Sequence, residues 1–175
     1  MSNPKTHFRG SCACARLTYT SASPPSATTT CFCNTCRKLS GSSSQTFTDI
    51  PSSALTLYDN AQALRYEGLP RESVGAVRIL RLSEFAERAV CVDCGAGVAM
   101  RYRAREGEVG VLVGSVDGEV EGLRAEKAIF VGSKPGWVEM GDFGGRRHER
   151  FPDGVEEVIM GWRGGDGGEK AEKAG

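Results

Sequence analysis

The chain has 175 residues, of which 39% are apolar and 25% are charged, so its composition is that of one folded domain and not of a disordered protein. Its 22 basic residues are balanced by 22 acidic ones, and this neutral balance argues against nucleic acid or an anionic membrane surface as a partner. No apolar run has the length of a membrane span.

The opening residues are polar and lack the apolar stretch of a secretory signal. We expect residues 1–7 to form an N-terminal arm, and the protein to reside in the cytoplasm or in the nucleus. Thiols stay reduced in both compartments, where cysteines commonly bind metal or take part in catalysis.

Short segments rich in Val, Ile, Thr, Tyr and Phe are separated by turn residues along most of the chain, which predicts a mainly β fold. The expected strands, in chain order, are residues 16–20, 45–50, 54–58, 77–82, 98–103, 109–116 and 127–131.

The remaining segments complete the expected organisation. Residues 21–30 contain only Ser, Ala, Pro and Thr and are expected to form a loop. Residues 35–40 fit one turn of helix, and residues 82–89 fit either helix or strand. We expect one domain over residues 8–163 and a disordered tail over residues 164–175, which has no apolar residue larger than alanine.

Seven cysteines form three groups with the spacings C-x-C, C-x-C-x-x-C and C-x-x-C. They are Cys12 and Cys14, then Cys31, Cys33 and Cys36, and then Cys91 and Cys94. Alternate residues of a strand point to the same face, and a C-x-x-C turn brings two sulfurs together. Gly95, directly after the last cysteine, suits the positive φ that such a turn often needs. These patterns are typical of zinc sites.

Seven sulfurs do not fill two tetrahedral sites, which together need eight ligands. The simplest division joins the two cysteine pairs in a closed structural site. Cys31, Cys33 and Cys36 then hold a second ion whose fourth position is open, as in catalytic zinc sites. We therefore predict two zinc ions per chain.

Other uses of the cysteines are less consistent with the pattern. Disulfides fit poorly with an odd count and the expected compartment. A redox pair of Cys33 and Cys36 would need a βαβ context, which the pattern lacks.

A single zinc ribbon is the main structural alternative. It would use Cys31 or Cys33 together with Cys36, Cys91 and Cys94, and it would leave Cys12 and Cys14 without a role. In a further alternative, a side chain such as His7, His148 or a carboxylate supplies the fourth ligand of the second zinc site, which is then closed.

Three thiolates give a zinc centre a net negative charge, which weakens the ion as a Lewis acid toward water. Such a soft site suits a thiol as the fourth ligand. A small thiol such as glutathione would bind as a thiolate and add to an aldehyde such as formaldehyde, so the pattern favours making or breaking a carbon–sulfur bond. Arg37 and Lys38 directly follow the cysteines and are candidates for binding the carboxylates of glutathione, with a solvated basic turn as the alternative.

Several motifs resemble those of the glutathione-dependent formaldehyde-activating enzyme family, which includes centromere protein V. They are Gly10-Ser11-Cys12-Ala13-Cys14, the run from Cys31 to Gly41, Cys91-Val92-Asp93-Cys94-Gly95, and Gly114-Ser115-Val116-Asp117. Two positions depart from the family pattern: Phe32 stands where histidine is frequent, and Ala15 stands where glycine is frequent.

The resemblance implies a β-tent fold of two twisted antiparallel sheets with zinc knuckles. It implies a structural zinc held by Cys12, Cys14, Cys91 and Cys94, and a catalytic zinc held by Cys31, Cys33 and Cys36. The implied activity is that of a carbon–sulfur lyase of the S-(hydroxymethyl)glutathione synthase type. The alternative is a non-catalytic zinc module that binds a protein partner, as centromere protein V would suggest.

Overall fold

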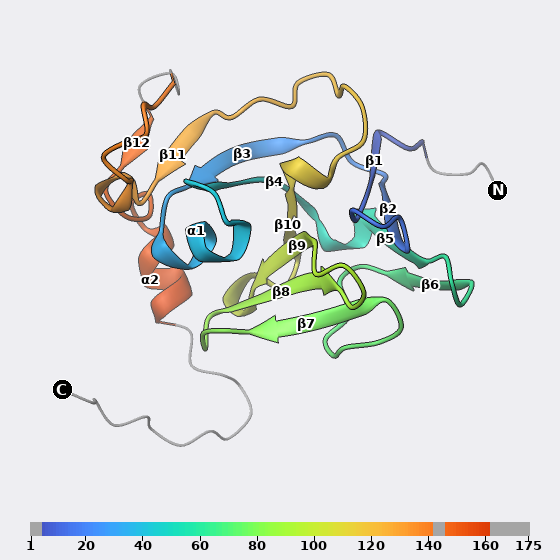
Figure 1. Ribbon diagram of the computed structural model, residues 1–175. Coiled ribbons are helices and arrows are strands. Elements are labelled where there is room, and N and C mark those ends of the chain that lie inside the picture. The colour runs from blue at the N-terminus through green and yellow to red at the C-terminus, as the bar shows by residue number, and fades with distance from the viewer. Residues whose placement is uncertain (1–4, 142–145, 162–175) are drawn as a thin grey trace.

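The computed structural model describes residues 5–141 and 146–161, which form twelve strands in two sheets and two short α-helices (Figure 1). The expected mainly β architecture of two sheets with few helices is confirmed. The expected tail, residues 164–175, and residues 1–4 of the expected arm lie outside the described residues.

The smaller sheet has the order β1-β2-β5-β6, and all neighbouring strands are antiparallel. Its strands are β1 (Phe8–Ser11), β2 (Leu17–Ser21), β5 (Leu55–Asp59) and β6 (Leu64–Glu67).

The larger sheet has the order β12-β11-β3-β4-β10-β9-β8-β7. Its strands are β3 (Ser26–Cys31), β4 (Gln45–Pro51), β7 (Val77–Arg81), β8 (Ala86–Cys91), β9 (Gly97–Tyr102), β10 (Glu108–Leu112), β11 (Lys127–Ile129) and β12 (Arg147–His148). Strand β11 pairs in parallel with both β3 and β12, so this edge differs from the all-antiparallel arrangement expected. The long connection between β10 and β11 allows β11 to run in the same direction as β3, because only antiparallel strands can be joined by a tight hairpin.

The main core lies between the two sheets. Strands β2 and β5 alternate buried and partly buried residues, so each presents one apolar face inward. Leu17 and Leu57 of the smaller sheet are fully buried and belong to the same apolar cluster as Val98 and Val111 of the larger sheet. This packing fixes the two sheets against each other.

The helices are short and lie beside the larger sheet. Helix α1 (Asn34–Ser40) contains the expected turn at residues 35–40 and is capped by Gly41, whose φ of 63° is the left-handed conformation common after a helix. Helix α2 (Val155–Met160) follows β12. Four 3-10 turns complete the structure: η1 (Ser52–Ala54), η2 (Arg103–Arg105), η3 (Val113–Ser115) and η4 (Val131–Ser133).

Two local expectations need correction. The loop expected over residues 21–30 is wrong in its second half, because β3 begins at Ser26. Threonine is β-branched and favours strands, and Thr28 is buried with its hydroxyl donating to that of Thr48 at 3.1 Å. The strand expected over residues 109–116 ends at Leu112 and continues as η3. Of the ambiguous residues 82–89, the first four form a bend and the last four belong to β8.

Two of the sequence motifs meet beside the smaller sheet. The hydroxyl of Ser11 donates to a carboxylate oxygen of Asp117 at 2.9 Å, and the hydroxyls of Tyr19 and Ser115 lie 2.9 Å apart. A Cβ atom on Gly10 would stand 2.2 Å from the Tyr19 hydroxyl oxygen, so only glycine fits there. These contacts anchor the chain immediately before the first cysteines.

Candidate metal centre

The first group of cysteines joins the two sheets. Cys12 and Cys14 lie in the turn between β1 and β2, whereas Cys91 ends β8 and Cys94 lies in the turn before β9. All four sulfurs lie within 4.8 Å of one another. The sulfurs of Cys12 and Cys14 converge because the chain turns, and not because they alternate along a strand as we expected.

Backbone N–H groups point at these sulfurs or close the turns that carry them. The N–H of Leu17 donates to the Cys12 sulfur at 3.3 Å, and that of Gly95 donates to the carbonyl of Cys91 at 3.0 Å. Gly95 has φ of 73°, as expected from the sequence. The hydrogen bond from the backbone of Ala96 lowers the pKa of the Cys94 thiol to about 6. The group thus has the donors and the support of a closed metal site.

An ion pair ties this site to the smaller sheet. The Arg16 guanidinium donates to both carboxylate oxygens of Asp59 at 3.2 Å and to Asp93, between Cys91 and Cys94, at 2.8 Å. The hydrogen bonds from Arg16 hold the pKa of Asp59 below its usual range. The turn that presents Cys94 is therefore held against β5.

The second group has three cysteines. Cys31 ends β3, Cys33 caps the first turn of α1, and Cys36 lies within that helix. Their sulfurs also lie within 4.8 Å of one another. The N–H of Cys36 donates to the Cys33 sulfur at 3.4 Å. Hydrogen bonds with Cys31 and Cys36 lower the pKa of Cys33, and hydrogen bonds with Cys33 and Cys36 raise the pKa of Cys31.

One basic residue beside the second group was missed by the sequence analysis. Arg88 of β8 is only 9% exposed and donates from Nη2 to the Cys36 sulfur at 3.8 Å. Its buried Nε has no hydrogen-bond partner among the described residues. The motif-based search had no signal for it, because Arg88 is 52 residues from Cys36 along the chain. The structure thus adds a buried cation to the three-sulfur group.

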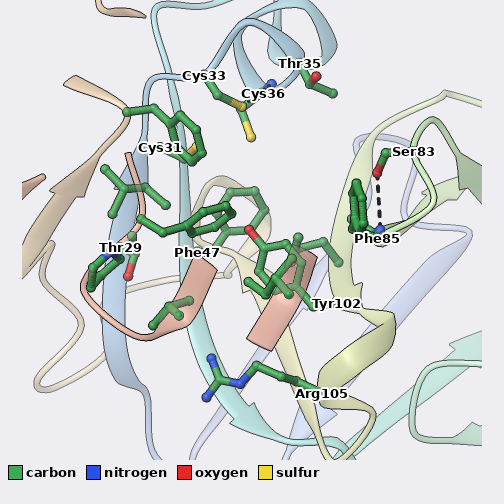
Figure 2. Close-up of a pocket in the computed structure, with 18 of the residues that line it drawn as sticks. Thr29, Cys31, Cys33, Thr35, Cys36, Phe47, Ser83, Phe85, Tyr102 and Arg105 are labelled. Atoms are coloured by element: carbon green, nitrogen blue, oxygen red, sulfur yellow. Dashed lines mark hydrogen bonds between the residues drawn. The ribbon is translucent and has the colours of Figure 1, made fainter. Parts of the chain in front are cut away.

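The three cysteines open onto a cavity of about 310 Å³. Figure 2 shows Phe47 and Tyr102 between the cysteines at one end of the cavity and Arg105 at the other. Asp49 and Lys127 also line it, and burial raises the pKa of Asp49 to about 6. The walls between the two ends are largely apolar.

The residues predicted to bind substrate lie elsewhere. The Arg37 guanidinium donates to the carbonyl of Ser133 at 2.7 Å and to Asn34 at 3.2 Å, which ties α1 to η4. Lys38 is exposed, and neither basic residue lines the cavity. Their contact with a substrate stays a prediction.

The donor sets fit a soft metal ion. Four cysteine sulfurs suit a structural zinc, and three suit an ion that keeps one position for another ligand. Neither histidine joins a group: within residues 5–141 and 146–161, no His, Asp or Glu side chain lies close enough to the sulfurs to complete the set. Phe32 is buried outside the cavity lining, and its N–H donates to the carbonyl of Ile129 at 3.0 Å.

The two-sheet fold and the two cysteine groups define a β protein equipped to bind soft metal ions. A sequence model of the family described as glutathione-dependent formaldehyde-activating enzyme matches residues 7–133, well over half of the chain. The chain belongs to this family.

A solved structure of a protein from Rhodobacter sphaeroides is similar, with 17% identity and a TM-score of 0.48, over 65% of this chain and 92% of the other. No curated protein sequence matches the chain. None of the helices in the described residues is long and apolar enough to cross a membrane.

Proposed function

We propose that the protein binds two zinc ions and uses the three-cysteine site to make or break the carbon–sulfur bond between a glutathione-type thiol and a small aldehyde. The observation that carries this proposal is the three-sulfur group of Cys31, Cys33 and Cys36, which faces a cavity. The family to which the chain belongs supports the same reaction class.

The four-cysteine site has a structural role in this proposal. It would link the turn after β1 to the turn after β8, and these turns connect strands of different sheets. A crosslink between Cys14 and Cys91 spans 77 residues. Constraining a loop of that size in the unfolded chain favours folding by about 4.5 kcal/mol on the chain-entropy account.

The residues around the three-cysteine site perform the remaining tasks. Zinc held by these thiolates would keep an incoming thiol deprotonated at neutral pH. Arg88 places a positive charge beside the sulfurs, where it offsets the negative charge that the incoming thiolate and a developing alkoxide bring. The apolar walls limit the access of water, which strengthens this attraction.

The bond changes balance without another reactant. In the synthetic direction the thiol loses its proton, its sulfur bonds to the carbonyl carbon, and the carbonyl π electrons move to oxygen, which takes up a proton. In the reverse direction the hydroxyl proton leaves, the carbonyl re-forms, and the sulfur departs as a thiolate that is protonated on release.

Cobalt substitution tests the proposal directly. We expect two cobalt ions per chain and a thiolate-to-cobalt charge-transfer band that grows when glutathione is added. Exchange NMR at chemical equilibrium should also show faster interconversion of glutathione and its formaldehyde adduct, a method that separates catalysis from the fast uncatalysed reaction.

Matched variants locate the response. Cys33→Ser should reduce the stoichiometry to one cobalt ion and remove the growth of the band. Ser40→Ala, in the same helix but outside the cavity lining, should behave as the parent protein. A spectrum that no thiol changes would contradict the proposal and favour a non-catalytic zinc module.

A further inference from the structure

One wall of the cavity comes from the C-terminal part of the chain. Phe151, Pro152, Val155, Ile159 and Met160 line it, the last three of them from α2. All five lie beyond residues 7–133, the range that the family sequence model matches. The family description therefore carries no information about this side of the cavity.

This wall is packed in a defined way. The Phe151 ring meets those of Phe130 and Tyr102 edge to face, with centroid distances of 4.8 Å and 5.9 Å. Phe130 has φ of 56°, an unfavourable conformation for a bulky residue, which the fold accepts while the ring lines the cavity. Cys31 and Cys36 belong to the same buried apolar cluster as Phe47, Met100 and Ile129.

Apart from Arg88 beside the sulfurs, the charged side chains that line the cavity lie near opposite charges. Arg105 lies 2.6 Å from Glu108, and the charge of Lys127 acts on the partly buried Asp49. Glutathione carries two carboxylates and an ammonium group, and each of these loses hydration if it enters an apolar cavity without a new partner. The lining favours a ligand whose body has no charge.

We propose that the thiol bound at the three-cysteine site carries an uncharged hydrocarbon body, which packs against Phe151 and Ile159 while its sulfur joins the cysteines. This inference rests on the carbon–sulfur chemistry of the proposed function and places a hydrocarbon thiol where that proposal has a glutathione-type thiol. The volume is sufficient, because a cavity of about 150 Å³ already holds a benzene ring and this one measures about 310 Å³.

A series of thiols tests the proposal on the cobalt-loaded full chain. Dissociation constants for 1-propanethiol, 1-butanethiol and 1-pentanethiol, read from the charge-transfer band, should fall about fourfold for each added methylene. Glutathione should bind at least tenfold more weakly than 1-pentanethiol.

The outcomes separate the two proposals. 2-Mercaptoethanol has almost no body and reports on the open metal site alone. If it binds while the alkanethiol series is flat, or if glutathione binds more tightly than 1-pentanethiol, the hydrocarbon substrate class is overturned and the proposed function stands. If no thiol binds, both are overturned.

Neighbouring residues of α2 supply a matched pair of variants. Ile159 is 1% exposed and lines the cavity, whereas Val158 is 53% exposed and does not. Ile159→Ala should weaken 1-pentanethiol binding about tenfold and leave 2-mercaptoethanol unchanged, and Val158→Ala should change neither. If Ile159→Ala does not fold, Met160→Gln, at a cavity position that is 45% exposed, provides the same test: it should weaken 1-pentanethiol binding and leave 2-mercaptoethanol unchanged. Equal effects on both thiols would overturn the assigned wall.

Discussion

Replacing Arg88 with methionine removes the buried positive charge beside the three-cysteine site and keeps a side chain of similar length. Nη2 of Arg88 lies 3.8 Å from the Cys36 sulfur, and the sulfurs of the group lie within 4.8 Å of one another. An incoming thiolate that is as close to the Cys36 sulfur as the other sulfurs of the group lies at most about 9 Å from the guanidinium, which is the sum of these two distances.

At an effective dielectric constant of about 20, two unit charges at this limiting distance attract by about 2 kcal/mol. Arg88→Met should therefore raise the dissociation constant of a neutral thiol such as 2-mercaptoethanol about 30-fold. Arg88→Lys keeps the charge and should recover most of the affinity. Arg78→Met removes the charge of an exposed residue of β7 and serves as the control.

The assay is the charge-transfer titration of cobalt-loaded protein at fixed pH and ionic strength. Each variant must first show two cobalt ions and the parent melting temperature, so that a change in thiol affinity is not a change in folding. Unchanged affinity in Arg88→Met, or an equal loss in Arg78→Met, would refute the electrostatic role of Arg88.

Three further predictions concern stability. Ala15 is exposed with φ of 58°, so Ala15→Gly should raise the free energy of unfolding by roughly 1 kcal/mol. A lower free energy of unfolding in urea denaturation would contradict this. The folded-state pKa of Asp49, about 6 against an ordinary 3.8, means that the folded state binds the proton more tightly. The free energy of unfolding should therefore rise as the pH falls from about 6 to 4. Asp49→Asn should raise the free energy of unfolding at pH 7.5 by at most roughly 3 kcal/mol and should flatten this pH profile. Glu87 and Arg101 are buried with a 2.5 Å contact, so Glu87→Gln should cost roughly 3–5 kcal/mol by leaving Arg101 without its counterion; a cost below 1 kcal/mol would show that the pair is well compensated.

Local features of the chain were predictable from the sequence. Strands such as β2 and β5 follow from alternating apolar and β-branched residues, a signal contained within a few neighbours. The division of the cysteines into a quartet and a triplet follows from their number and spacing, and the structure brings the same two groups together. Gly95 was identified because a C-x-x-C turn needs its positive φ.

Other features depend on contacts between residues far apart in the chain. Strand β3 was missed because its Pro-preceded Ser/Thr segment has loop composition, and pairing with β4 stabilises it as a strand. Arg88 lies near Cys36 only because the folded chain brings this residue of β8 close to α1, and nothing in its own sequence neighbourhood marks it.

The sequence by itself thus determined the chemistry of the ligands, because metal-binding spacing is local. Only the tertiary structure decided which side chains surround the open three-cysteine group: Arg88 from β8, Phe130 after β11 and Ile159 from α2. Strand pairing and helix docking place these residues together, and neither composition nor periodicity specifies which distant segments will meet.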